Sequence, residues 1–219
     1  PSPNNSSKLP AASEETKRHW ITSAPRRYGS VRLIQQDPRL YDPLIKRAAK
    51  RWNIDVNTLR GLIQAESRFD PRARSHTGAA GMGQFTGVAI AEIKRLAKMN
   101  KYAFGFTNDA KLKETLMSFD KTKAHTPLYG IEGTALYLKY VLDRYKTEES
   151  ALTAYNAGHK MARLVEKYGS HAKAKAAGVL NFSQAKSYAP KVLKYKKQFK
   201  SGQWPGVSSD GITGALGQD

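Results

Sequence analysis

One carboxylic acid lies inside an otherwise apolar helical stripe. Four residues have the i, i+3, i+4, i+7 spacing of a single buried helix face: Leu59, Leu62, Ile63 and Glu66. Asp55 stands just before the stripe as a candidate N-cap, and Pro71 stands after it as a stop signal. The pattern therefore predicts a helix that carries an ionisable group on its inward face, within a fold that is mainly α.

Burial would change the chemistry of Glu66. Loss of solvation raises the pKa of a glutamic acid from about 4.3 towards roughly 6, so the group can hold a proton near neutral pH. Such a carboxyl group is suited to general acid catalysis. The alternative is that Glu66 only rims the helix and forms a salt bridge.

Short motifs follow Glu66 in order along the chain. The stretch E-S-R-F-D-P-R-A-R-S-H-T-G-A-A-G begins at Glu66 and leads into G-M-G-Q, which ends at Gln84. Ile131-Glu132-Gly133 with Tyr137-Leu138, A-Y-N-A-G around Tyr155 and S-Y-A-P-K-V around Tyr188 come later. In this order, over roughly residues 40 to 197, the motifs resemble those of the lytic transglycosylases whose soluble members carry a lysozyme-like domain.

The resemblance implies a fold and a set of site residues. It implies a lysozyme-like (SLT) domain in which Glu66 is catalytic, Ser75 and Gln84 bind substrate near the cleavage point, and Tyr155 hydrogen-bonds around Glu66. Tyr188 lies in the tyrosine-containing segment that ends the domain, and we expect it to bind substrate as well. From the residues alone, Ser75 could instead be a turn-forming serine and Tyr155 a core tyrosine.

The implied reaction needs one carboxyl group. Glu66 would protonate the bond between N-acetylmuramic acid and N-acetylglucosamine, then act as base on the muramoyl 6-hydroxyl, which closes a 1,6-anhydro ring without water. Two alternatives stay open. A hydrolytic muramidase of the goose-type lysozyme kind would need a base such as Asp70 or Asp120, although Asp70 just before Pro71 is expected to cap local backbone. A non-enzymatic cell-wall-binding virion module would keep the fold alone.

Composition excludes several other classes of protein. The chain of 219 residues has no cysteine, and none of its five histidines has H-E-x-x-H spacing, so we expect neither a metal site nor a cofactor. No run of 18 apolar residues and no hydrophobic signal segment occurs, so we expect no transmembrane segment. One monomeric catalytic domain with extensions is the simplest organisation.

The net charge of +19 points to an anionic partner. From residue 160 to 200 there are eleven Lys or Arg and one acid, Glu166. These cations form a solvated helix face, attract cell-wall polymer through its peptide carboxylates or, as the weakest alternative, attract nucleic acid. Tyr188, Tyr195 and Phe199 interleave with them, but no organised nucleic-acid motif surrounds these aromatics, so we expect no specific nucleic acid.

Periodicity divides the chain into three parts. We expect a flexible N-terminal extension over 1–36, the lysozyme-like domain over 37–200 and a flexible glycine-containing tail over 201–219. Residues 100–127 resemble the family least and are expected to form a variable wall of the substrate cleft. Helices are expected near 38–52, 55–70, 88–99, 109–119, 131–145, 148–156, 159–168 and 183–199.

The biological setting is less constrained than the chemistry. The substrate implied by the resemblance is the glycan strand of peptidoglycan, so the protein would act in the bacterial periplasm or cell wall. The G-M-G-Q-F variant and the basic tails favour a virion-associated enzyme of a phage. The alternatives are a secreted accessory enzyme of a secretion system and a bacterial wall-remodelling enzyme. In the phage setting we expect other virion proteins as partners, and in the secretion setting we expect other secretion-system proteins.

Overall fold

The computed structural model describes residues 37–180 and 185–207. Within these ranges the chain is mainly helical, as expected, and its only extended pairing is a pair of isolated bridges that join Arg74, Ala80 and Phe85. In chain order the helices are η1 (Pro38–Tyr41), α2 (Asp42–Trp52), α3 (Val56–Ser67), α4 (Gly87–Ala97), η2 (Asn100–Phe106), α5 (Ala110–Met117), α6 (Lys121–Ala124), α7 (Pro127–Arg144), α8 (Glu148–Tyr168), α9 (His171–Ala176) and α10 (Tyr188–Lys200).

The α3 helix begins where its sequence predicts. The side chain of Asp55 accepts hydrogen bonds from the backbone amides of Asn57 and Thr58, which satisfies two donors of the first turn. The helix ends at Ser67 because Arg68 takes a left-handed conformation with φ 52°, three residues before Pro71. The stripe Leu59, Leu62 and Ile63 is fully buried.

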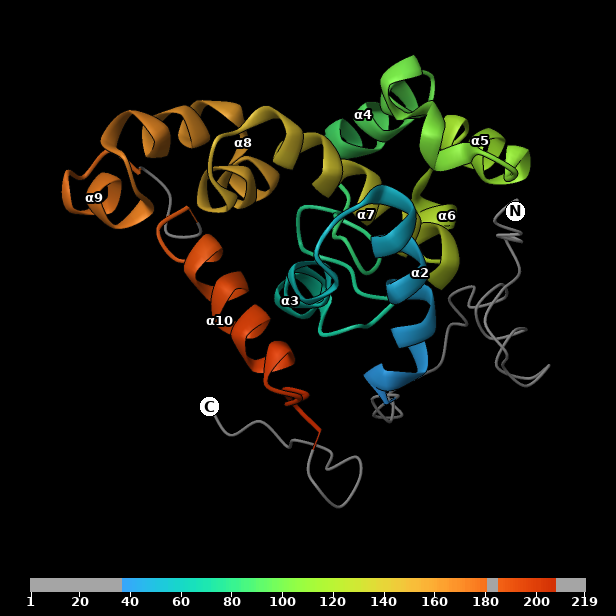
Figure 1. Cartoon of the computed structure of the whole chain (residues 1–219), viewed down its shortest axis with the longest axis horizontal. Coiled ribbons are helices and arrows are strands. Elements are labelled where there is room, and N and C mark those ends of the chain that lie inside the picture. Colours follow the sequence, from blue (N-terminus) through green and yellow to red (C-terminus); the bar gives the residue numbers. More distant parts are fainter. Residues whose placement is uncertain (1–36, 181–184, 208–219) are drawn as a thin grey trace, which may run out of the picture.

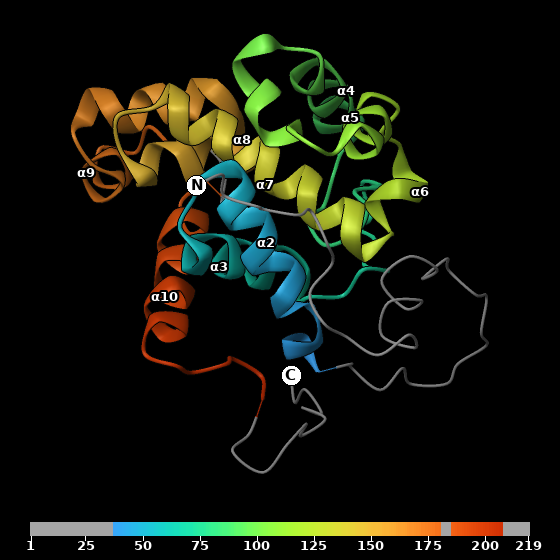
Figure 2. The same cartoon turned by 45° about the vertical axis from the view of Figure 1, so that its right-hand side comes forward.

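Helix α3 lies between α2 and α10 (Figures 1 and 2). The contact with α10 is especially close at Gly61, where an added Cβ would lie 2.8 Å from the carbonyl oxygen of Val192 and 3.0 Å from the amide nitrogen of Lys196. A larger residue at position 61 would therefore hold the two helices apart. This packing sets how far the start of α10 lies from the end of α3.

The α7 helix packs against α2, α3, α4, α5, α6 and α8. Its buried Glu132 accepts hydrogen bonds from the indole Nε1 of Trp52 (2.9 Å) and from Nε of Arg51 (3.1 Å), and Arg47 lies 3.5 Å away. Desolvation raises the pKa of Glu132, while the two arginines and the indole N–H oppose that rise. This cluster of charges ties α2 to α7 inside the core.

The α8 helix has a break at Gly158, whose φ of 81° and ψ of 171° are not helical. The two helices expected over 148–156 and 159–168 are thus the two arms of α8. They are joined at Gly158, whose backbone conformation only glycine adopts readily. The second arm covers a small separate core made of Met161, Val165, Ala174, Leu180 and Ala185.

Residues 100–127 do not form the cleft wall that we expected. They build η2, α5 and α6, which pack on the side of α4 and α7 (Figure 2). Apolar side chains explain this position: Phe106 packs edge-on against Trp52, and Phe119 packs edge-on against Phe85. The expectation was wrong because these aromatics enter the common core instead of facing solvent.

The packed structure continues past residue 200. The Trp204 ring packs against Phe199 and Phe69, and the guanidinium of Arg60 lies 5.4 Å from its ring centroid. The first residues of the expected C-terminal tail therefore belong to the domain. Residues 208–219, the expected extension over 1–36 and the internal segment 181–184 lie outside the described residues.

Candidate functional site

A cleft of about 500 Å³ opens at the end of α3. Its lining comes from the end of α3, the loop over 75–86, the start of α4, the middle of α7, the first arm of α8 and the start of α10. All five site residues expected from the sequence lie in this lining: Glu66, Ser75, Gln84, Tyr155 and Tyr188. Segments that are distant in the sequence thus meet around one carboxyl group.

Glu66 is half-buried beside two tyrosines. The Tyr188 hydroxyl donates a hydrogen bond of 2.5 Å to Oε1 of Glu66. Burial raises the pKa of Glu66 to about 7, although the Tyr188 hydrogen bond and the positive charge of Lys191 both lower it. Near neutral pH the group therefore exists in both its protonated and its ionised form, which suits a proton donor that must later accept a proton.

The sequence predicted that Tyr155 hydrogen-bonds around Glu66, but the Tyr155 hydroxyl has another partner. The Tyr155 hydroxyl donates to the carbonyl of Gly83 at 3.2 Å, and Tyr188 from α10 holds the carboxyl group instead. Tyr155 also packs against Tyr137 with ring centroids 4.9 Å apart. Burial and the nearby Glu66 raise its pKa well above the ordinary value, so it stays a neutral hydroxyl at the cleft wall.

Ser75 and Gln84 shape the loop that forms one side of the cleft. Ser75 Oγ accepts a hydrogen bond from the amide of Ala79 at 2.9 Å, so it has the turn-forming role considered for it while also lining the cleft. Gln84 has a φ of 49°, and its Nε2 donates to the carbonyl of Gly81 at 2.9 Å. Both bonds lie within the loop, so they fix its shape.

Several lining residues were not expected from the sequence. Lys191 lies three residues after Tyr188 on α10, and its Nζ donates to the Ala65 carbonyl at 3.3 Å. Asn156 lines the cleft with a buried Oδ1 that has no hydrogen-bond partner among the described residues. Val88 is 82% exposed at the rim. Helical spacing from Tyr188 was the one available signal for Lys191.

Glu66 is the only acid among the described residues that line the cleft. Asp70 accepts from the backbone amide of Arg72 at 2.8 Å, as expected for a local cap, and Asp120 caps α6 through the amide of Lys123. Neither residue lies in the cleft lining. Within the described ranges, no three histidine or acidic side chains are grouped as ligands for a metal ion, and no helix has the length and apolarity needed to cross a membrane.

The described helices form the lysozyme-like fold that the motifs implied, and their cleft opens onto one half-buried glutamic acid, Glu66. Residues 43–177 match the family model described as the transglycosylase SLT domain. The chain belongs to this family.

Several curated relatives are named as transglycosylases, and one solved structure shares the fold. A transglycosylase of Enterobacteria phage PRD1 is 29% identical over 54% of this chain and 35% of its own length. Membrane-bound lytic murein transglycosylase C of Actinobacillus pleuropneumoniae is 28% identical over 57% of this chain and 32% of its own. The 70 kDa soluble lytic transglycosylase SLT70 of Escherichia coli matches with a TM-score of 0.57 and 22% identity over 75% of this chain and 25% of that one.

The alignments cover only part of those proteins. A third relative, membrane-bound lytic murein transglycosylase F of Desulfosudis oleivorans, is 42% identical over 62 residues, which is 28% of this chain and 13% of that protein. The chain thus spans between 13% and 35% of the length of these three curated relatives. The likeness to SLT70 shows the fold.

Proposed function

We propose that this chain is a peptidoglycan lytic transglycosylase that cleaves the β-1,4 bond between N-acetylmuramic acid and N-acetylglucosamine and releases 1,6-anhydro-muramoyl products. One observation carries the proposal: the described lining of the cleft contains a single carboxyl group, Glu66, whose pKa is raised to about 7 by burial. Membership of the SLT family supports the same activity.

The proposed reaction uses Glu66 twice. In its protonated form Glu66 gives its proton to the glycosidic oxygen, so the bond from that oxygen to the anomeric carbon breaks and N-acetylglucosamine leaves with a new hydroxyl. The carboxylate then takes the proton of the muramoyl 6-hydroxyl as that oxygen bonds to the anomeric carbon. The proton returns to Glu66 and no water is consumed. The Tyr188 hydrogen bond stabilises the carboxylate between the two steps.

The cleft composition favours this route over hydrolysis. Glycosidases that use water place two carboxyl groups across the bond, with the second one as nucleophile or as base for the water. Asp70 and Asp120, the candidates for that base, hold backbone amides outside the cleft. A 6-hydroxyl on the same sugar needs no second carboxyl group because it is already held beside the reacting carbon, which gives it a high effective concentration.

The other lining side chains suit the binding of a sugar. Ser75, Gln84, Tyr155 and Tyr188 offer hydroxyl and amide groups around Glu66. The partner we propose is a glycan strand of peptidoglycan, with the domain, which begins at residue 37 and includes Trp204, acting as a monomer in the bacterial periplasm or cell wall. The relative in phage PRD1 supports a virion-associated setting among the alternatives considered.

The product tests the proposal. Purified, unreduced peptidoglycan is digested with the protein, and the muropeptides are analysed by mass spectrometry before and after borohydride treatment. We expect fragments lighter by one water than those of a muramidase digest, and we expect borohydride to leave them unchanged. A digest dominated by hydrated, reducible ends would replace the transglycosylase with the muramidase. If no muropeptides are released, the non-enzymatic wall-binding module is the alternative that the result supports.

A further inference from the structure

A second hollow, of about 510 Å³, adjoins the cleft on the side of α9 and α10. Ser187 and Lys191 line both cavities, so the two adjoin along the first turn of α10. The hollow is basic, with four lysines and one acid among its described lining residues: Lys175, Lys186, Lys191, Lys194 and Glu149. The cleft, by contrast, is lined mostly by uncharged groups around Glu66.

The floor of the hollow is held in place by hydrogen bonds. The backbone amide of His171 donates to Oε2 of Glu149 at 3.0 Å, so the one acid of the hollow is engaged at the start of α9. The buried imidazole of His171 donates through Nε2 to the carbonyl of Ala185 at 2.7 Å. That bond fixes the chain just before Lys186 and Ser187, so the hollow is a built part of the fold.

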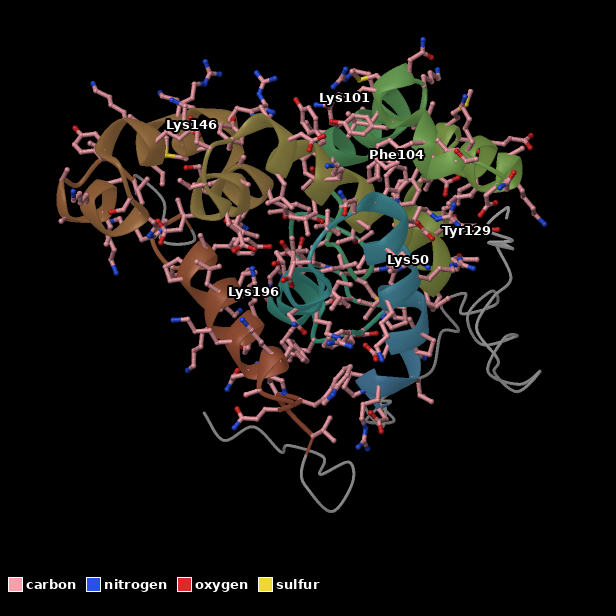
Figure 3. All side chains as sticks on the ribbon, in the orientation of Figure 1. Lys50, Lys101, Phe104, Tyr129, Lys146 and Lys196 are labelled. Atoms are coloured by element: carbon pink, nitrogen blue, oxygen red, sulfur yellow. The ribbon has the colours of Figure 1, made fainter. Side chains whose placement is uncertain are left out.

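The lysines around this floor are available to a ligand. Lys175, Lys186 and Lys194 are exposed, and within the described part of the chain none of them has a salt bridge. Lys196 differs, because its ammonium group lies 2.8 Å from the carboxylate of Glu148 and in Figure 3 it lies beside α3. Positive charge is therefore left uncompensated at the hollow, where it favours an anion.

We infer that the hollow binds the carboxylates of the peptide attached to the muramoyl unit next to the cleavage point. This inference rests on the proposed function. The sugars of a glycan strand carry no charge in their rings, whereas the stem peptide that branches from the muramoyl lactyl group ends in free carboxylates. A strand in the mostly uncharged cleft would thus bring its anionic branch to an adjoining cavity whose described lining is basic. The chain would then select strands that still carry peptides.

The test compares two soluble glycan fragments of equal length. One keeps its stem peptides; the other is stripped of them by an amidase, and the lactyl carboxylates that this exposes are converted to methylamides so that no anion remains at the branch point. We expect the wild-type protein to cleave the peptide-bearing fragment with the higher kcat/KM. The variant Lys175→Ala, Lys186→Ala, Lys194→Ala should lose that preference, with kcat/KM on the peptide-bearing fragment reduced about tenfold and that on the stripped fragment unchanged. Lys191 is left in place because it also lies beside Glu66.

A matched control removes the same charge elsewhere. Lys160, Lys167 and Lys173 are exposed lysines of α8 and α9 that lie outside both cavities, and their alanine variant should keep the preference. A peptide-bearing fragment whose carboxylates are amidated should behave like the stripped fragment. Thermal unfolding of each variant checks that the domain remains folded.

The possible outcomes separate this inference from the proposed function. If wild-type protein releases no anhydro product from either fragment, the proposed function fails. If it cleaves both fragments equally well, or if the control variant loses the preference as strongly as the hollow variant, only the inference about the hollow is overturned. Single-stranded DNA that competes with the wild type but not with the hollow variant, without any peptide preference, would assign the hollow to nucleic acid and overturn the inference as well.

Discussion

The hydroxyl of Tyr188 donates a hydrogen bond of 2.5 Å to the carboxyl group of Glu66, which lies 122 residues earlier in the chain. Two opposing effects meet at this contact. Burial favours the protonated acid, while the hydroxyl and the charge of Lys191 favour the carboxylate. The balance leaves Glu66 with a pKa of about 7. Tyr188 is therefore both a wall of the cleft and a control on the acid that we propose to be catalytic.

We predict that Tyr188→Phe shifts the pH dependence of cleavage upwards. The free enzyme must hold a proton on Glu66, so kcat/KM should fall by about tenfold per unit as pH rises above the pKa of about 7. Removal of the hydroxyl removes an effect that lowers this pKa, so the fall should begin at a higher pH. The measurement is a profile of kcat/KM against pH on soluble glycan fragments. An unmoved or lowered alkaline limb would contradict this role for Tyr188.

We predict that Glu66→Gln reduces peptidoglycan clearing by about 100-fold or more, because the amide cannot donate a proton as an acid. Turbidity loss of purified walls measures this effect. Glu114→Gln is the matched control, since Glu114 is exposed on α5 outside the cleft. Near wild-type clearing by a folded Glu66→Gln protein would remove Glu66 from the mechanism.

The same substitution should stabilise the protein at neutral and alkaline pH. The pKa of Glu66 is raised from the ordinary 4.5 to about 7, so the folded state binds the proton more tightly than the unfolded state. The contribution of Glu66 to stability is fully present below pH 4.5 and is lost as pH rises through 7. Glu66→Gln should therefore raise the free energy of unfolding at pH 8 by up to about 3 kcal/mol, and by close to nothing at pH 4. Denaturant titrations at both pH values check the sign.

We predict that Glu132→Ala destabilises the fold by about 3 kcal/mol. It would leave Arg51, Arg47 and the indole N–H of Trp52 without their shared buried acceptor. Because Glu132 lies outside the cleft, the pH at which kcat/KM falls should not move in protein that remains folded. Urea unfolding and a pH profile at low temperature measure the two effects. A shifted profile would mean that this cluster also controls Glu66.

We predict that Gly61→Ala weakens both stability and cleavage. The added Cβ would meet the backbone of α10 at 2.8 Å, so α10 must move away from α3, at a cost of about 1–3 kcal/mol. That movement carries Tyr188 away from Glu66. Gly87→Ala is the control for stability, since no atom lies within 4 Å of its added Cβ. Unfolding curves and cleavage rates for the two variants test the prediction, and a Gly61→Ala protein as active as wild type would contradict it.

Binding to purified walls should weaken steeply with salt, because exposed charges are screened within about 8 Å at physiological ionic strength. Sedimentation with walls at several salt concentrations measures this effect, and salt-independent sedimentation would make the charge a solvated face only.

Two neighbouring lysines of α10 should differ in their effect on stability. Lys197→Ala removes one exposed charge and should change stability by less than about 0.5 kcal/mol. Lys196→Ala also breaks the ion pair with Glu148 and should cost about 1 kcal/mol. Unfolding curves of the two variants measure the difference, and equal stability of both proteins would contradict the prediction.

Local patterns in the sequence were enough for most of the helices. The stripe around Glu66, its N-cap Asp55 and the break at Gly158 depend on residues close together in the chain, and all three lie where those residues indicate. The motifs also identified five residues that the fold brings to one cleft. What they could not identify was which tyrosine contacts Glu66, because that depends on the approach of α10 to α3.

Other misjudged residues share this cause. Lys196 looked like its neighbours in a basic run, yet Glu148 from α8 pairs with it. Phe106 and Phe119 looked like parts of a variable surface, yet the core rings of Trp52 and Phe85 receive them. In each case the partner is more than thirty residues away, and no periodic pattern records such a contact.

The place of α10 in the chain also sets the order in which the cleft can be completed during synthesis. A ribosome delivers Glu66 and its loop early, but the hydroxyl that adjusts the acid, the ammonium group beside it and the helix that packs on Gly61 all arrive with α10, the last helix of the described residues. A nascent chain that has reached only α9 holds a carboxyl group with no finished cleft around it. Synthesis of α10 thus completes the described lining of the cleft, which can form only after translation has passed residue 191.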